Sequence, residues 1–176
     1  MIFLTTGTQE PFDRLLKAVD EVAPSLGTTI IAQVSRSAYV AKHFETFAFA
    51  SPGDFNRYFN EAELIISHAG MGTIISALER EKPILIMPRL ARYREHRNDH
   101  QLATAQVFQK LNYVHVAFDE AELKTKLLTV FNSGLQPLHK IGKFASPELM
   151  GSIKSFLFRQ ENLKAAKGGK VNTNGI

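Results

Sequence analysis

Short apolar runs alternate with amphipathic segments along the first 160 residues of the chain. The apolar or β-branched runs predict six strands, at 2–5, 28–34, 44–49, 64–66, 84–87 and 113–117. Amphipathic segments with helical spacing separate and follow these runs, and they lie at 11–19, 51–59, 71–78, 99–111, 123–131 and 146–157. Strands that alternate with helices predict an α/β fold, a Rossmann-like parallel sheet with helices on both faces.

The most informative segment is the strand 64–66 and the helix that follows it. Apolar residues recur there as in a helix that lies on a sheet, at Met71, Ile74, Ile75 and Leu78. A strand that enters a helix through a glycine-rich turn leaves free backbone N–H groups at the start of the helix.

Gly70 and Gly72 would let a phosphate approach those N–H groups closely, so the turn predicts an anion site. The alternative is that the two glycines merely close a tight turn. The turn is not the dinucleotide fingerprint, which needs a third glycine, and the chain has no Gly-Lys-Ser/Thr of a P-loop.

Composition fits one ordinary soluble domain. The chain has 176 residues, of which 44% are hydrophobic and 22% are charged. It has no cysteine, which excludes disulfides and thiolate metal sites. The start of the chain predicts a strand rather than a signal peptide, and no apolar run reaches 18 residues, so we expect a cytoplasmic protein. We expect the domain to cover 1–160 and a polar, flexible tail to cover 161–176.

Positive charge is concentrated in one segment, which contains Arg89, Arg92, Arg94, His96, Arg97 and His100. Such a segment suits nucleic acid, an anionic lipid or a diphosphate, or it is simply a solvated loop. Nucleic acid is disfavoured because Tyr93 is the only aromatic residue among the arginines. Ligands of parallel sheets bind at the carboxyl ends of strands, so Gly7-Thr8, the turn 68–73 and the loop 89–101 should share one rim.

Four motifs occur in a fixed order, and together they resemble the C-terminal, donor-binding half of family 28 glycosyltransferases. They are Thr6-Gly7-Thr8 followed by Pro11-Phe12-Asp13-Arg14-Leu15, His68-Ala69-Gly70-x-Gly72-Thr73, Lys82-Pro83 leading into Met87-Pro88, and Asn98-Asp99-His100-Gln101. The resemblance covers roughly residues 1–160 and implies a single GT-B half-domain. It looks closest to the small PssE-type subunits of exopolysaccharide and capsule synthesis, and it extends to the eukaryotic subunit that makes dolichol-linked chitobiose.

The resemblance also implies a binding site for a UDP-sugar. The turn Ala69, Gly70, Met71, Gly72 and Thr73 would hold the diphosphate, Gly7 and Thr8 would line the opposite side, and His100 and Gln101 would bind the sugar hydroxyls. Ser76 stands where relatives commonly have a ribose-binding glutamate, with Glu79 one turn along as a substitute. Glu81 stands where relatives tend to have glycine, and a left-handed backbone there would cost roughly 1 kcal/mol.

The implied activity is transfer of a sugar, with inversion, from a UDP-sugar to a lipid-linked acceptor in exopolysaccharide or capsule synthesis. No metal or other cofactor is expected. Inversion needs a base, for which the local candidates are His68, Asp99 and His100. His68 could equally just cap the turn, and we expect the base to come from a membrane-anchored partner. This partner would supply the acceptor half and hold this chain at the inner face of the membrane. The alternative is a non-catalytic accessory subunit that stabilises the true transferase.

Overall fold

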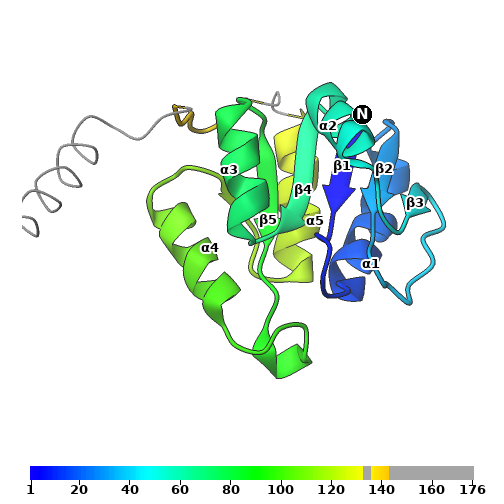
Figure 1. Cartoon of the computed structure of the whole chain (residues 1–176), viewed down its shortest axis with the longest axis horizontal. Coiled ribbons are helices and arrows are strands. Elements are labelled where there is room, and N and C mark those ends of the chain that lie inside the picture. The colour runs from blue at the N-terminus through cyan, green and yellow to red at the C-terminus, as the bar shows by residue number, and fades with distance from the viewer. Residues whose placement is uncertain (133–135, 143–176) are drawn as a thin grey trace, which may run out of the picture. The chain divides into compact units, whose positions relative to one another are not determined.

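The computed structural model describes residues 1–132 and 136–142, and its strands form one parallel sheet in the order β3-β2-β1-β4-β5-β6 (Figure 1). The strands are β1 (Ile2–Thr5), β2 (Ile30–Gln33), β3 (Glu45–Phe47), β4 (Leu64–His68), β5 (Ile84–Met87) and β6 (His115–Val116). The helices are α1 (Asp13–Val22), α2 (Pro52–Glu61), α3 (Met71–Glu79), α4 (His100–Lys110) and α5 (Glu120–Asn132), with 3-10 turns η1 (Ala23–Ser25) and η2 (Ala91–Tyr93).

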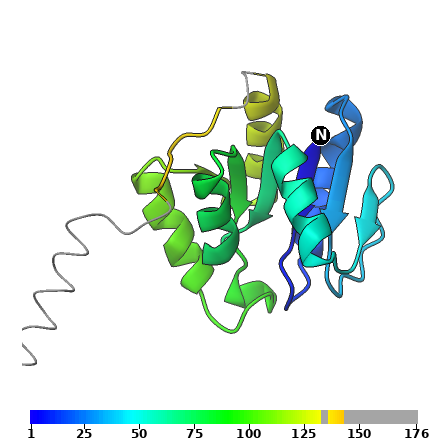
Figure 2. The ribbon, with the colours of Figure 1, turned by 45° about the horizontal axis from the view of Figure 1, so that its top comes forward.

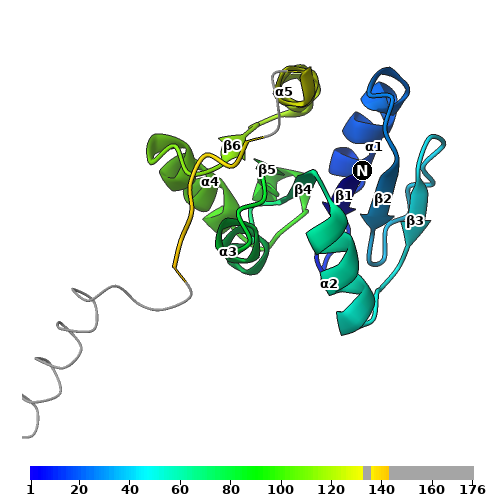
Figure 3. The ribbon, with the colours of Figure 1, turned by 90° about the horizontal axis from the view of Figure 1, so that it is seen from above.

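Helices cover both faces of this sheet. Seen from above, α1 and α5 lie on one face while α2 and α3 lie on the other (Figure 3). Alternate strand residues point to the two faces, so Ile2 and Leu4 pack with the helices α1 and α5 while Phe3 joins the opposite core. The predicted fold class is therefore confirmed.

The order of the strands reverses around β1. From β1 the chain proceeds outward through β2 and β3, then returns to pair β4 with the free edge of β1, where Ile2 lies opposite Leu64. It continues outward through β5 and β6. In Figure 2 the loops that leave the carboxyl ends of β1 and β5 lie close together at the lower edge of the ribbon. A ligand crevice is expected at this reversal point, between the ends of β1 and β4.

Local sequence signals account for where the helices begin. The Ser51 hydroxyl accepts a hydrogen bond from the Asp54 N–H at 3.1 Å, and Pro52 occupies the first turn, so α2 starts as the sequence predicts. All six predicted strands, and the predicted helices up to residue 131, are confirmed with boundary shifts of a few residues. Among the described helices, none is long and apolar enough to cross a membrane.

The predicted buried face of α3 is partly wrong. Met71 is 46% exposed and Ile75 is 38% exposed, while Ile74, Ala77 and Leu78 make the contact with the sheet. The small side chain of Ala77 takes a contact position, which rotates the buried stripe away from Ile75. Helical spacing alone could not separate these two faces, because both follow the same period.

Glu81 adopts the left-handed backbone that the sequence comparison suggested, with φ of 55°. Its N–H donates to the Leu78 carbonyl and the Lys82 N–H donates to the Ala77 carbonyl, which closes the end of α3. This is the hydrogen-bond pattern in which glycine is the usual residue at the left-handed position.

Residues up to Ile141 form one compact unit. The predicted helix at 146–157 and the tail at 161–176 lie outside the described residues, and the boundary near 160 stays a prediction.

Candidate functional site

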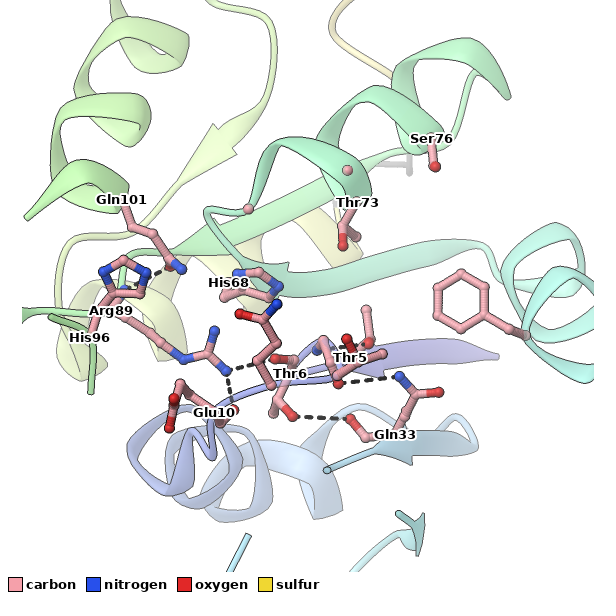
Figure 4. Close-up of a pocket in the computed structure, with 16 residues that line it drawn as sticks. Thr5, Thr6, Glu10, Gln33, His68, Thr73, Ser76, Arg89, His96 and Gln101 are labelled. Atoms are coloured by element: carbon pink, nitrogen blue, oxygen red, sulfur yellow. Dashed lines mark hydrogen bonds between the residues drawn. The ribbon is translucent and has the colours of Figure 1, made fainter. Parts of the chain in front are cut away.

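A cavity of about 580 Å³ lies at the carboxyl ends of β1 and β4, where the strand order reverses. The three segments predicted to share one rim all contribute to it (Figure 4). Its walls are Thr5, Thr6, Gly7, Thr8, Gln9, Glu10, Gln33, Phe55, His68, Gly70, Gly72, Thr73, Ser76, Arg89, His96 and Gln101.

The imidazole of His68, at the end of β4, fits between two glycines. A Cβ atom at Gly7 would stand 2.8 Å from His68 Nε2, and one at Gly70 would overlap the ring outright. Gly7 also has a φ of 80°, which a side chain rarely adopts. Both glycines are therefore required by the histidine as much as by any ligand.

His68 is uncharged at neutral pH. Burial, together with the positive charge of Arg89, lowers its pKa to about 4. Its Nδ1 atom is buried and has no hydrogen-bond partner among the described residues. A neutral imidazole so enclosed is a weak base, which argues against the predicted catalytic role of His68.

The start of α3 presents uncapped backbone N–H groups to the cavity. Its N-cap residue is Gly70, which has no side chain to accept a hydrogen bond, and a Cβ at Gly72 would meet open space. The Thr73 hydroxyl points into the same space (Figure 4). Unsatisfied N–H groups and the positive end of the helix dipole favour an anion at this place.

Arg89 places a buried positive charge beside this helix end. Its side chain is only 3% exposed, and Nη2 donates to the Thr6 carbonyl at 2.6 Å and to the Glu10 carbonyl. Burial lowers its pKa to about 10, so it remains a cation at neutral pH. Within residues 1–132 and 136–142 its guanidinium forms no ion pair, and Nε has no partner. The carboxylates of Glu95 and Glu10 act on Arg89 only from a distance, and an anion in the cavity would give it a direct partner.

The basic segment predicted from the sequence is therefore divided in the structure. Arg89 is buried against the cavity, whereas Arg92, Arg94 and Arg97 are exposed. The sequence shows only that all four arginines are positively charged. It does not show which of them is buried, because burial depends on where η2 turns the chain.

The cavity has two chemically different ends. Ser76 and Gln33 lie at one end, and Gln101, His96 and Glu10 lie at the other (Figure 4). The buried Gln101 side chain accepts a hydrogen bond from the Arg89 N–H at 3.2 Å, which fixes its carbonyl oxygen. Gln33 is fixed too, because it donates to the Gly7 carbonyl at 3.3 Å and accepts from the Ala50 N–H at 3.1 Å.

Most of the predicted site residues meet in this cavity. Those that line it are Gly7, Thr8, His68, Gly70, Gly72, Thr73, Ser76 and Gln101. Those that do not are Ala69, Met71, Asp99 and His100, together with the substitute Glu79.

The four predicted residues outside the cavity have visible reasons to lie there. Ala69 is buried in the core beneath α3, and the Met71 side chain points to solvent. The Asp99 carboxylate accepts a hydrogen bond from the Ala91 N–H at 2.9 Å and lines a separate hollow beside Arg92. His100, at the start of α4, is exposed away from the cavity.

Glu10 and Gln33 line the cavity but were not predicted as part of the site, whereas Arg89 and His96 were predicted only as members of the rim loop 89–101, without roles of their own. Gln33 ends the second predicted strand, so the strand-end rule could have found it. Glu10 and His96 lie in loops, where the direction of a side chain does not follow from spacing. No three His, Cys, Asp or Glu side chains gather as a metal site in the part of the chain that is described.

The sequence profile of the glycosyltransferase family 28 C-terminal domain matches residues 1–152. The chain belongs to this family. The family assignment covers every described residue, including the whole cavity, so the resemblance seen in the motifs is confirmed at the level of the family 28 domain.

Curated relatives of this family 28 domain are UDP-N-acetylglucosamine transferase subunits named ALG13. The subunit of Candida albicans is 38% identical over 79 residues, which are 44% of this chain and 26% of that protein. The human protein is 32% identical over 122 residues, 62% of this chain and 10% of that protein. The chain thus spans only a small part of these two relatives. The Debaryomyces hansenii subunit is 26% identical over 164 residues, 85% of this chain and 76% of that protein.

These relatives do not support the expected closest likeness to the PssE-type subunits, nor the exopolysaccharide setting.

Solved structures share the fold of this family 28 domain. The NMR solution structure of ALG13 has a TM-score of 0.56 at 22% identity and covers 78% of this chain and 88% of that chain. The S. aureus MnaA–UDP co-structure has a TM-score of 0.57 at 13% identity, over 89% of this chain but 46% of that chain. Os79 from O. sativa, solved with UDP, has a TM-score of 0.55 at 16% identity, over 74% of this chain and 32% of that chain. The predicted GT-B half-domain is confirmed.

Proposed function

We propose that the chain is the donor-binding subunit of a glycosyltransferase and that its cavity holds a UDP-sugar. A membrane-associated partner would supply the acceptor site and hold the complex at the cytoplasmic face of the membrane. The sugar would pass, with inversion, to a lipid-linked saccharide. UDP-N-acetylglucosamine is the first donor to test, since the relatives are named for it. Exopolysaccharide or capsule synthesis is not part of what we propose, because the relatives give it no support.

The observation that carries this proposal is the uncapped start of α3, which faces a cavity beside Arg89, an arginine with no ion-pair partner in the described part of the chain. Gly70 provides no cap, Gly72 leaves open space, and Arg89 brings a buried positive charge to the same cavity. A diphosphate would satisfy all three features at once. As UDP departs it gains negative charge, which the helix dipole and Arg89 would stabilise without a metal or another cofactor.

The two ends of the cavity give the donor a direction. Ser76 follows the uncapped turn along α3 and lies at the end with Gln33, which suits the nucleoside. Gln101 lies at the opposite end, where its fixed amide suits the sugar hydroxyls. Ser76 is shorter than the glutamate expected at its position, so ribose binding would depend more on neighbouring groups such as Gln33.

The test is binding of UDP and UDP-N-acetylglucosamine to the full chain by calorimetry, with Gly72→Asp as the decisive variant. Its carboxylate would occupy the open space at the start of α3, and repulsion of the diphosphate should lower affinity at least about 100-fold, a cost of a few kcal/mol. Gly53→Asp is the matched control, because Gly53 also lies in the first turn of a helix, α2, but outside the cavity. Unchanged UDP affinity in a folded Gly72→Asp protein would disprove the site.

A further inference from the structure

A second cavity, of about 550 Å³, adjoins the sugar end of the donor cavity. Gln9, Glu10 and His96 line both of them. His96 and Glu10 lie near Gln101 in Figure 4, opposite Ser76. In the proposed direction of the donor, the reacting carbon of the sugar would therefore stand close to the junction of the two cavities. A group that takes a proton from an acceptor hydroxyl belongs at this junction.

The ring of His96 is held in one orientation by Asn98. His96 Nδ1 lies 3.1 Å from the Asn98 carbonyl oxygen and 3.1 Å from Asn98 Oδ1. The Asn98 Oδ1 atom also accepts from the His100 N–H at 3.3 Å, which identifies it as the oxygen of the amide.

These contacts favour a proton on Nδ1 of His96. Both oxygens are acceptors, so Nδ1 is the donor, and the Asn98 N–H, at 3.5 Å, makes only a longer contact with the same atom. The lone pair of the neutral ring is then on Nε2, which has no hydrogen-bond partner among the residues described here. A histidine oriented through Nδ1 with a free Nε2 is arranged as a general base.

The other candidate bases are less well placed. His68 is enclosed between two glycines, and Asp99 is engaged by the Ala91 N–H outside the cavity. Glu10 lines both cavities, but no described residue hydrogen-bonds its carboxylate or fixes its orientation. Among these groups only His96 combines a position at the junction with an anchored ring.

We propose that His96 is the general base of the transfer, an inference that rests on the proposed function. The acceptor enters through the second cavity. Its hydroxyl oxygen forms a bond to the anomeric carbon from the side opposite UDP, and the proton of that hydroxyl passes to His96 Nε2. The bond between the anomeric carbon and the UDP oxygen breaks, and its electron pair leaves with UDP towards the start of α3.

The first test is turnover of UDP-N-acetylglucosamine by the full chain combined with membranes that contain its partner. The amide of His96→Asn can still donate to Asn98 but offers no basic nitrogen. We expect it to lose at least ~100-fold in kcat while UDP affinity stays within about twofold. His43→Asn is the matched control, since His43 is also held through Nδ1, by Asp20, and lies outside both cavities. Imidazole should restore part of the activity of His96→Ala.

Different results would contradict the role of His96 and the proposed function. Full turnover by His96→Asn, or loss in Glu10→Gln alone, would overturn the assignment to His96 while the donor site stands. Absence of UDP binding by the wild-type chain would instead overturn the proposed function.

A second test does not depend on turnover. Long-range proton–nitrogen spectra of the labelled chain, with His96 assigned by its loss in His96→Asn, report the tautomer of the neutral ring. We expect the proton on Nδ1, and a proton on Nε2 would overturn the proposal.

Discussion

The His68 side chain couples protonation to folding. In the unfolded chain its pKa is about 6.5, whereas burial and Arg89 lower its pKa to about 4 in the folded protein. Between these values the unfolded state binds more protons than the folded state. His68 therefore does not reduce the free energy of unfolding above about pH 6.5, and it reduces that free energy increasingly as the pH decreases towards 4.

The expected size of this effect is up to roughly 3 kcal/mol by pH 4, from about 1.4 kcal/mol for each unit of pKa shift. Urea unfolding of the wild type and of His68→Gln at pH 7, 5.5 and 4.5 measures it. The variant should lose less stability on acidification. His115, whose pKa burial also lowers, acts in the same direction but is present in both proteins, so it cancels in the comparison. If the free energy of unfolding fell equally with pH in the wild type and in His68→Gln, the burial of a neutral His68 would be contradicted.

The backbone conformation of Glu81 lowers the free energy of unfolding. It holds φ of 55° at the end of α3, where glycine is the usual residue. We expect Glu81→Gly to raise the free energy of unfolding by about 0.5–1 kcal/mol, because glycine adopts this backbone without strain. The loss of the exposed ion pair between Glu81 and Lys140 would make the gain slightly smaller. Glu79→Gly is the control of opposite sign, because Glu79 is helical and glycine there should destabilise α3. Thermal unfolding of both variants measures these two opposite changes in stability.

At the scale of elements, Arg14 of α1 holds the connection between β5 and α4. Its Nε and Nη2 atoms donate to the two carboxylate oxygens of Glu95 at 2.7 and 2.9 Å, and Nη2 also donates to the Pro88 carbonyl at 3.1 Å. Glu95 in turn accepts from the Leu90 N–H at 3.0 Å. This connection positions the lining residues Arg89 and His96, so the ion pair supports the cavity although it lies outside the donor cavity.

We expect Glu95→Gln to cost roughly 2 kcal/mol of stability, below the value for breaking a fully buried pair, because Arg14 loses one carboxylate partner but keeps Glu120 at 3.2 Å. Affinity for UDP-sugars should fall as well, since the loop loses its anchor. The double variant Arg14→Gln/Glu95→Gln should lose less than the sum of the single variants. The exposed pair of Lys124 and Glu21 is the control, and Lys124→Gln should leave unfolding unchanged. Additive losses would mean that the pair does not act as a unit.

The sequence predicted the elements well and the site only in part, for a physical reason. Periodicity reports whether a residue faces the core of its own element, so strands such as Ile84–Met87 were predicted at their observed bounds. The rule for carboxyl ends of strands also brought Gly7 and His68 to one place. The direction of Arg89, His96 and Glu10 depends on how loops meet across distant segments, and no local pattern encodes that.

At the scale of the whole molecule, the described residues make up one GT-B half-domain. The match covers 74% of this chain but 32% of the Os79 structure. The acceptor must be held in line with the reacting carbon, and such positioning is worth about 7–11 kcal/mol. In the proposed function the described residues form the donor half, and a partner polypeptide supplies this positioning of the acceptor.

We therefore expect the purified chain to bind donor but to transfer little or no sugar, and a membrane-associated partner to restore transfer. Fractionation should find the chain in membranes only when the partner is present. A variant that cannot bind UDP, such as Gly72→Asp, should reach the membrane but not restore transfer. If that variant does restore transfer, the chain is an accessory that stabilises the true transferase. Robust transfer by the purified chain alone would contradict the need for a partner.

The return of the chain to β1 has a consequence for how the protein is made. β1 pairs with β2 on one side and β4 on the other, and roughly sixty residues separate Thr5 from Leu64. At typical rates of synthesis, about 5–20 residues per second, the ribosome needs several seconds to deliver β4 after β1. During that interval the edge of β1 that later pairs with β4 has no partner strand. Slow codons before Leu64 should therefore increase aggregation of the nascent chain more than slow codons after Met87.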